Sequence, residues 1–342
     1  MRRFLLAALL LLTAGCAVPT GTTGARSEVT VALVGDILLN DAVLAGRGAD
    51  YPWQRVATRL RQADLAIGNL ETAVSARGTP AADKLYTFRS HPSALAGAQR
   101  AGLDVFSLAN NHALDYGPEA LLDTIEHVRA AGLAPVGAGR DSDEALRPAI
   151  INVDGFRVAV LAFTRVIPAP GWVAGFRHPG MATGWEPEPV LTAIRNARAR
   201  ADAVIVLMHW GEEMKEHPRP ADADLARAMA KAGATVVAGH HPHVLQGFEW
   251  QGQSLIAYSL GNFIFTRSTS PAGRETGILT VTLGRRGVRK ARFLPLTIEA
   301  GQPRPVGPES KAEMLHRIKS LSTAKITRTG LLLPPRDPFP PD

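Results

Sequence analysis

The stretch Thr-Val-Val-Ala-Gly-His-His-Pro-His, residues 235–243, joins a short apolar run to three histidines within four residues. The run has the composition and length of a buried strand, which the following Gly-His ends. His241 and His243 lie two positions apart, and Pro242 stiffens the bend between them, so both imidazoles can face one site. Because neutral imidazole is a common metal ligand, the stretch predicts a metal site after a strand. Turn histidines with local hydrogen bonds are the alternative.

The same order of apolar run and polar end recurs along the chain. Four more runs of this kind lie at 29–34, 65–67, 105–108 and 204–208. Helical patterns separate the runs, at 118–131, 188–201 and 221–232. Interleaved strands and helices predict crossover connections and a mostly parallel sheet. Other apolar runs pair as hairpins: 149–153 with 157–163, 244–250 with 254–259, and 277–283 with 288–296. We therefore expect an α/β fold with two packed sheets and helices outside.

Most polar residues of interest follow predicted strand ends, where open α/β sheets gather their ligand sites. They are Asp36, Asn69, Glu71, Asn111, His112, Asp115, His209, His241 and His243. Strand alternation puts Asn69 and Glu71 on one side, and Asp115 is close enough in sequence to orient His112. A nitrogen and oxygen ligand set without sulfur predicts Mn, Zn or Fe, as one or two divalent ions.

Several of these residues also have a structural interpretation. Asp36 is a candidate N-cap for a following helix. His209 follows an entirely apolar run, so it is either a metal ligand or a buried histidine with hydrogen-bond partners. Glu212 and Glu213, at the predicted start of a helix, would complement the helix dipole.

The N-terminus has the features of a secretory signal. Arg2 and Arg3 precede an apolar run at 4–12, which is too short to span a bilayer comfortably. Cys16, the only cysteine of the chain, occupies the lipidation position of a bacterial lipobox. We expect a lipoprotein signal peptide at 1–15 and a linker at 16–28. The protein would then be exported and lipid-anchored in the cell envelope, at the outer membrane facing the periplasm in a two-membrane bacterium. An ordinary signal peptide with a chance cysteine is the alternative.

Length and charge limit the remaining choices. A chain of 342 residues, 46% hydrophobic, can bury the core of a large α/β domain, which we expect at 29–300. We expect a C-terminal extension at 301–342, with a helix at 308–321 and a proline-rich tail. The net charge of +7, which falls to +5 when the signal with Arg2 and Arg3 is removed, would favour anionic polymers or head groups, with a solvated basic face as the simpler interpretation. Nucleic acid is not expected as a partner, because the chain is expected to be exported and its aromatic residues do not alternate with basic residues.

Six motifs in order resemble the CapA family, the bacterial poly-γ-glutamate capsule-synthesis type also named PgsA-like. They are Val34-Gly35-Asp36, Gly68-Asn69-Leu70-Glu71, Asn110-Asn111-His112-Ala113-Leu114-Asp115-Tyr116-Gly117, His209-Trp210-Gly211-Glu212, Gly239-His240-His241-Pro242-His243 and Tyr258-Ser259-Leu260-Gly261-Asn262-Phe263. The resemblance covers about 29–296. It implies a four-layer α/β/β/α sandwich of the calcineurin-like metallophosphoesterase type.

The resemblance also implies roles for individual residues. The implied metal ligands are Asp36, Glu71, Asn111, His209, His241 and His243. His112 matches the catalytic histidine that protonates a leaving group, with Asp115 beside it. Candidate substrate-binding residues are Arg89, Asn69, His240 and Asn262, although Arg89 is alternatively a surface arginine and Asn262 a turn cap. Two positions depart from the superfamily pattern: Leu38 replaces a histidine, and Glu71 replaces the usual bridging aspartate.

Three functions remain open. The first is synthesis or export of poly-γ-glutamate or a related anionic capsule polymer, with capsule-synthesis proteins as partners. The second is metal-dependent hydrolysis of phosphoester or γ-glutamyl amide bonds in a phosphorylated or carboxylated substrate, with His112 as general acid. The third is a non-catalytic envelope scaffold.

Overall fold

The computed structural model describes residues 26–44, 46–82, 84–266 and 270–335. The predicted signal peptide, Cys16 and most of the predicted linker lie outside these residues, as does the end of the proline-rich tail. Within the described ranges, no helix has the length and apolar character needed to cross a membrane.

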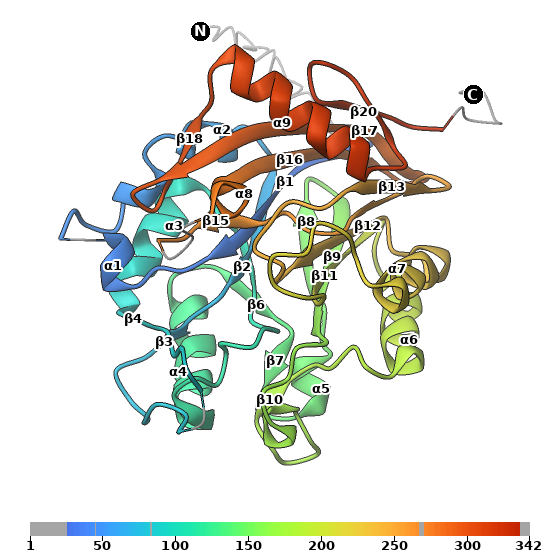
Figure 1. Ribbon diagram of the computed structural model, residues 1–342. Coiled ribbons are helices and arrows are strands. Elements are labelled where there is room, and N and C mark those ends of the chain that lie inside the picture. The colour runs from blue at the N-terminus through green and yellow to red at the C-terminus, as the bar shows by residue number, and fades with distance from the viewer. Residues whose placement is uncertain (1–25, 45, 83, 267–269, 336–342) are drawn as a thin grey trace, which may run out of the picture.

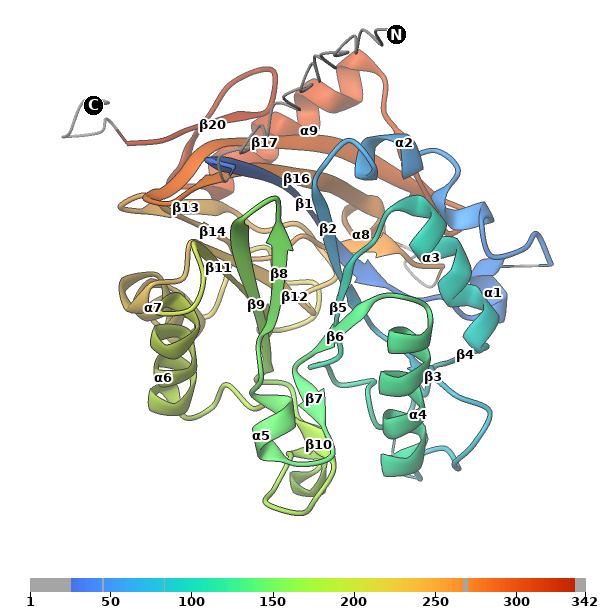
Figure 2. The ribbon, with the colours of Figure 1, turned by 180° about the vertical axis from the view of Figure 1, so that it is seen from behind.

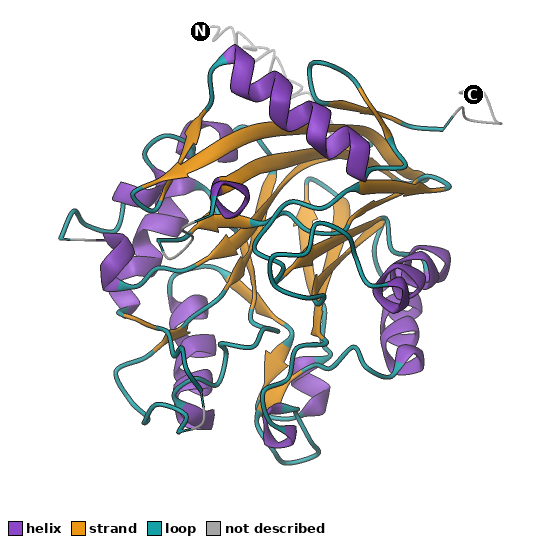
Figure 3. Cartoon of the chain, viewed as in Figure 1, coloured by secondary structure: helices purple, strands orange, loops and turns teal. Residues whose placement is uncertain are grey.

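Two large sheets form the centre of the molecule (Figures 1 and 3). The first runs, in order, through β19 (Lys325–Ile326), β20 (Leu331–Leu333), β17 (Gly287–Glu299), β16 (Glu275–Gly284), β1 (Glu28–Ile37), β2 (Leu65–Leu70), β5 (Val105–Ser107) and β6 (Ala134–Val136). β15 (Asn262–Ile264) pairs with β1, and β18 (Gln302–Pro305) pairs with β17. The second runs through β13 (Phe248–Gln251), β14 (Ser254–Ala257), β12 (Val236–His240), β11 (Ala203–His209), β9 (Phe156–Thr164) and β8 (Ala149–Val153).

The remaining elements connect and cover these sheets. Two short ladders join β3 (Ala73–Val74) to β4 (Arg89–Ser90) and β7 (Ala138–Gly139) to β10 (Gly180–Met181). The α-helices of the described part are α1 (Asp41–Leu44), α2 (Ala57–Leu60), α3 (Leu95–Ala101), α4 (Gly117–Ala130), α5 (Ser142–Ala145), α6 (Pro187–Arg198), α7 (Pro220–Ala232), α8 (Pro271–Arg274) and α9 (Pro308–Leu321). Its 3-10 helices are η1 (Tyr51–Trp53), η2 (Pro92–Ala94) and η3 (Pro170–Trp172).

Strand alternation divides the apolar residues between three layers of core. On β1, Val31 and Leu33 face a cluster shared with Val160 of β9 and Ile205 of β11, so this cluster fills the space between the sheets. The intervening residues of β1 face α3 and α4, while those of β9 and β11 face α6 and α7. Figures 1 and 2 show α3 and α4 on one side of the sheets and α6 and α7 on the other. The predicted four-layer α/β/β/α sandwich is confirmed.

The segment after Gly301 adds to the first sheet. β18 pairs with β17, and β20 pairs with both β17 and β19. On α9, Met314, Leu315 and Ile318 are buried in the cluster between the sheets. The helix lies across the top of the molecule in Figure 1.

Most predicted elements are present, with small differences at their ends. β8 and β9 form the predicted hairpin, and α9 has the predicted bounds. The strand expected at 244–250 begins only at Phe248, because Leu245 makes a single bridge with Leu260. β1 continues through Asp36 to Ile37, because the parallel neighbours β2 and β15 both pair with this end. Asp36 therefore lies within a strand, and its interpretation as a helix N-cap is wrong.

A glycine allows this end of β1 to be covered closely. A Cβ atom on Gly35 would clash with the backbone carbonyl of Gly261. Without a side chain at that position, the backbone N–H of Asp36 donates to the Gly261 carbonyl at 2.9 Å. The register of the parallel strands then places Asp36 beside Asn69 on β2 and Asn262 on β15.

Candidate metal centre

Both sheets contribute side chains to one buried polar cluster. Asp36, Asn69 and Glu71 come from β1, β2 and the residue after β2. Asn111 and His112 follow β5, and His209 ends β11. His241 and His243 follow β12. The six predicted ligands range from fully buried (Asp36, Glu71) to partly buried (His243). The structure brings these residues together from separate segments of the chain, as predicted.

Glu71 lies at the centre of the cluster. Its carboxylate oxygen Oε1 is 3.9 Å from His112 Nε2, 4.0 Å from His209 Nε2 and 3.7 Å from His243 Nε2. These separations exceed hydrogen-bond distance, and both Glu71 oxygens are buried without a hydrogen-bond partner among the described residues. A buried carboxylate without a partner costs free energy, and a bound cation would offset that cost. The arrangement of atoms around Glu71 therefore fits a cation.

Two overlapping groups of ligand atoms lie close enough to hold ions. Glu71, His241 and His243 form one group, and Asp36, Glu71 and His209 form the other, each with its ligand atoms within 4.8 Å of one another. Glu71 belongs to both groups, so its carboxylate could bridge two ions or serve one. The oxygen and imidazole donors suit a divalent transition metal.

Hydrogen bonds orient the ligands around Glu71. Asn69 donates from Nδ2 to Asp36 Oδ1 at 2.9 Å, and Asn110 donates to Asn69 Oδ1 at 3.0 Å. Asn262 Oδ1 is 2.8 Å from His243 Nδ1, and the Asn262 amide donates to the carbonyls of His243 and Gly273. An Nδ1–H that donates to Asn262 directs His243 Nε2 toward the space around Glu71, where it could bind a metal once deprotonated. Asn69 and Asn262 thus hold two candidate ligands, Asp36 and His243, in place.

The other histidine ligands are held in different ways. His209 Nε2 is 2.8 Å from Asn111 Oδ1, so the imidazole and the amide oxygen predicted as ligands are neighbours. His241 Nδ1 is buried and has no hydrogen-bond partner within the described ranges. His241 and His243 have φ values of 94° and 57°, in a region that side-chain-bearing residues rarely adopt. Such strain concentrates at functional sites, where the surrounding structure maintains it.

Burial and charge set the protonation of the cluster. Burial, together with the charge of Asp36, raises the pKa of Glu71 well above its usual value. Burial lowers the pKa of His209 well below its usual value and that of His241 to about 3, with neighbouring histidines adding to both shifts. For His243, the charges of Glu71 and Asp36 outweigh burial and raise the pKa to about 10. His209 and His241 are therefore neutral at pH 7, the form in which imidazole binds metals.

His112 is linked to Asp115 on the side away from Glu71. His112 Nδ1 is 2.6 Å from Asp115 Oδ2, which also accepts from the backbone N–H of Phe88 at 2.6 Å. The Phe88 ring stacks on the His112 ring with centroids 4.1 Å apart. His112 Nε2 therefore faces Glu71, while Nδ1 is held by a carboxylate.

Lys84 also contacts this pair, and the sequence analysis missed it. Its Nζ donates to Asp115 Oδ1 and to the carbonyl oxygen of Asn111, and lies 2.9 Å from His112 Nδ1. The side chain is 15% exposed. Lys84 belongs to no strand, helix or motif, and only the folded loop brings it to Asp115.

Other candidate residues lie at the edge of the cluster. His240 is buried, and its Nε2 is 3.1 Å from the carbonyl oxygen of Val34. The Arg89 guanidinium donates to the carbonyls of Arg77 and Gly78 and stacks on Tyr116. These contacts hold the two side chains against backbone, and their predicted role in substrate binding stays a prediction.

The two departures from the superfamily pattern have different surroundings. Leu38 is buried in an apolar cluster with Phe88, Phe265 and Ile298, and these described neighbours offer no metal ligand in place of the missing histidine. Phe88 contacts His112 and Phe265 contacts His243, which makes one wall of the centre apolar. Glu212 and Glu213 are exposed, and α7 begins only at Pro220, so their interpretation as helix-start acids is wrong.

Comparison with known proteins identifies the family. Residues 30–267 match the family described as bacterial capsule synthesis protein PGA_cap. The capsule biosynthesis protein CapA of Bacillus anthracis is 34% identical over 310 residues, which are 88% of this chain and 75% of that protein. This chain belongs to the PGA_cap family. The PGA biosynthesis protein CapA of Bacillus subtilis is 32% identical over 297 residues, covering 85% of this chain and 77% of that protein.

Solved structures provide a more distant likeness for this PGA_cap member. The NAD nucleotidase NadN of Haemophilus influenzae is 13% identical, with a TM-score of 0.49, over 88% of this chain and 65% of that one. A 5'-nucleotidase from Candida albicans is 11% identical, with a TM-score of 0.44, over 79% of this chain and 52% of that one.

Proposed function

We propose that this protein is a divalent-metal-binding component of poly-γ-glutamate capsule synthesis or export. Family membership supports the capsule role, since the two Bacillus relatives are named for capsule and PGA biosynthesis. The observation that supports metal binding is the buried carboxylate of Glu71, which has no hydrogen-bond partner in the described part of the chain and lies among three imidazole nitrogens at 3.7–4.0 Å.

Different residues at this centre would bind the metal, orient its ligands and transfer a proton. Asp36, Glu71, Asn111, His209, His241 and His243 would hold the metal. A bound divalent ion polarises an anionic or carbonyl substrate and lowers the pKa of water. Asn69 and Asn262 orient Asp36 and His243 through hydrogen bonds. His112 Nε2 faces the same space and can deliver a proton there, while Asp115 fixes the ring.

Metal analysis tests the proposal. The purified full-length chain, treated with a chelator and reconstituted separately with Mn²⁺, Zn²⁺ and Fe²⁺, should retain at least about one ion per chain after desalting. The Glu71→Gln variant should lose that ion, whereas a variant of an exposed histidine, His217→Ala, should keep it. Less than about half an equivalent with every metal would contradict the proposal.

A hydrolase is the second candidate, and the His112–Asp115 pair favours it. An imidazole that faces a metal centre and is held by a buried carboxylate is the arrangement of a general acid. We expect His112→Ala to keep its metal and lose turnover of whichever phosphoester or γ-glutamyl amide substrate the wild type cleaves. If His112→Ala supports capsule formation as well as the wild type does, the centre serves a scaffold instead.

We also propose that the protein is exported and held in the envelope by a lipid on Cys16, which lies outside the described residues. The support is the order of Arg2-Arg3, the apolar run at 4–12 and the single cysteine. Replacement of the thiol in Cys16→Ser should move the protein from the membrane fraction to the soluble fraction. An unchanged membrane fraction would contradict lipidation at this residue.

A further inference from the structure

The positive charge of this protein is concentrated in its C-terminal part. Residues 285–333 contain eleven Lys and Arg side chains and three Glu, a formal charge of +8, whereas the whole chain carries +7. All other residues together are therefore nearly neutral. This part of the chain builds β17 to β20 and α9, and all of it follows the 30–267 stretch that matches the family.

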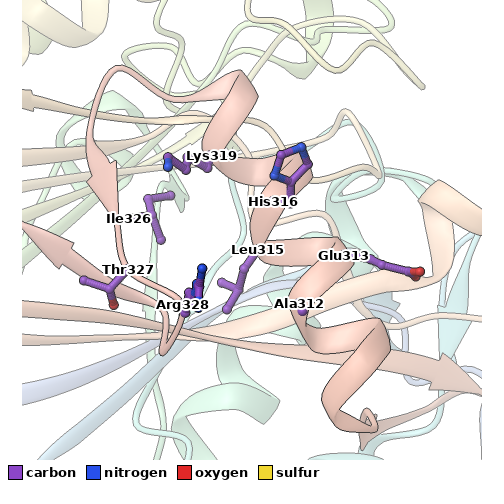
Figure 4. Close-up of a pocket in the computed structure, with 8 residues that line it drawn as sticks. All are labelled: Ala312, Glu313, Leu315, His316, Lys319, Ile326, Thr327 and Arg328. Atoms are coloured by element: carbon purple, nitrogen blue, oxygen red, sulfur yellow. The ribbon is translucent and has the colours of Figure 1, made fainter.

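A groove opens between α9 and the β19–β20 hairpin (Figure 4). Its volume is about 560 Å³, within the range of roughly 300–1,000 Å³ typical of small-ligand pockets. Its lining residues are Ala312, Glu313, Leu315, His316, Lys319, Ile326, Thr327 and Arg328. Leu315 and Ile326 give it an apolar floor, and both are buried.

The cations of the groove have no acidic partner in the described part of the chain. Lys319 and Arg328 are exposed, and neither has a described carboxylate within 4.0 Å. Glu313 is the one acid among the lining residues, and its carboxylate points away from Lys319 and Arg328 in Figure 4. By contrast, Arg317 on the same helix is paired with Glu216 and Glu275.

We propose that the groove between α9 and β19–β20 binds a linear polycarboxylate, with Lys319 and Arg328 as the carboxylate-binding cations. The proposal rests on the proposed capsule function for the choice of polymer. Poly-γ-glutamate has one free carboxylate and two backbone methylenes in each unit. Lys319 and Arg328 match the carboxylates, and the floor of Leu315 and Ile326 matches the methylenes. A concave groove accepts a single chain, whereas a flat bilayer surface would not reach its floor.

An ion pair connects α9 to the loop beside the candidate metal centre. Arg317 pairs with Glu216, in the loop that follows His209 and β11. In the same loop, the backbone N–H of Met214 donates to the Pro242 carbonyl, between the ligands His241 and His243. A polymer bound along α9 would therefore lie on a helix that is joined, through this loop, to the segment that carries His241 and His243.

Polymer binding by matched variants tests this proposal. Binding of poly-γ-glutamate to the metal-loaded full-length chain would be measured by calorimetry at low and high salt. The double variant Lys319→Glu/Arg328→Glu should weaken binding about tenfold or more, and the wild-type affinity should fall as salt rises. The control Arg200→Glu/Lys231→Glu reverses two exposed cations outside the groove, near the ends of α6 and α7, with the same change in net charge. It should bind nearly as well as the wild type.

Three other outcomes would overturn the proposal. Equal losses in both double variants would mean that net charge alone attracts the polymer. Retained polymer binding in the groove variant would place the site elsewhere. Vesicles of anionic phospholipid are the second probe. If the groove variant loses binding to these vesicles but keeps binding to the polymer, the surface faces a membrane. Metal content, measured on the same samples, separates this test from the metal analysis described above. A chain that binds the polymer but retains no metal would contradict the proposed metal centre and leave the proposed polymer groove standing.

Discussion

Glu71 has two buried oxygens and no hydrogen-bond partner among the described residues, although three imidazoles surround it. A side chain in this state costs free energy unless it is protonated or binds a cation. Its pKa is raised by burial and by Asp36, so the folded metal-free protein takes up a proton more readily there than the unfolded chain does.

The first prediction concerns the pH dependence that follows. Because the folded pKa of Glu71 is the higher one, its contribution to stability is present at low pH and is lost as pH rises. In chelator, the wild type should therefore lose unfolding free energy relative to Glu71→Gln as pH rises above about 4.3, the ordinary value for glutamate. Urea unfolding of both proteins across pH 4–8 measures this. A constant difference between them would contradict the raised pKa.

The second prediction concerns Lys84. Its charge lowers the pKa of His112, while Asp115 raises it and burial is the largest lowering cause. Lys84→Met should therefore raise the pKa of His112, measured by NMR titration in chelator, and lower stability by about 1–3 kcal/mol because a buried carboxylate loses a partner.

The matched control for this prediction is Lys215→Met, which removes an exposed lysine. Metal content should stay unchanged in both variants. A stability loss in Lys84→Met with no shift of the His112 pKa would mean that Lys84 only fastens its loop.

Among the elements, α4 holds the loop that carries Lys84. Asp123 on α4 accepts from Ser75 Oγ at 2.6 Å and from Arg77 Nε at 2.8 Å. Thr124 of the same helix accepts from the backbone N–H of Val74 at 2.8 Å. The start of the loop after β3 is thus fastened to a helix outside the sheet, and its later part reaches Asp115.

The third prediction tests this attachment. The hydrogen bond from Arg77 lowers the pKa of Asp123 to about 2, so its contribution to stability is present above about pH 4 and is lost as pH falls toward 2. Asp123→Asn should lower the urea midpoint at pH 7, and the difference from the wild type should shrink between pH 4 and pH 3. Glu126→Gln, an exposed acid on the same helix, should show no such difference at either pH.

In the whole molecule, the candidate metal centre lies where the two sheets meet. Asp36, Glu71 and Asn111 belong to the first sheet and the segments that follow its strands, while His209, His241 and His243 belong to the second. An ion held by both sets would cross-link layers that also meet through their apolar core and through polar contacts such as that of His209 Nε2 with Asn111 Oδ1.

The fourth prediction is that metal stabilises the entire fold. Ligand bound only to the native state adds about 2.7 kcal/mol at a free concentration of one hundred times Kd. The melting temperature of the reconstituted protein should therefore fall when chelator is added, as one cooperative transition, in scanning calorimetry. Glu71→Gln should melt at the same temperature with and without chelator. A wild type indifferent to chelator would show that the ion does not join the sheets.

The sequence by itself determined the layers and most of the cluster. Alternation and strand length are local properties, so the runs at 29–34 and 204–208 predicted β1 and β11, and the ends of these runs predicted Asp36 and His209. The hairpin of β8 and β9 and the bounds of α9 were equally local.

Only the tertiary structure decided the contacts between segments distant in sequence. Lys84 reaches Asp115 because the loop after β3 folds back, and nothing in the spacing of that loop reveals it. The unpartnered state of Glu71 depends on distances between side chains of both sheets. The groove at Lys319 and Arg328 exists because the β19–β20 hairpin packs beside α9. Sequence patterns report which face of an element is apolar, but packing alone sets which polar atoms meet.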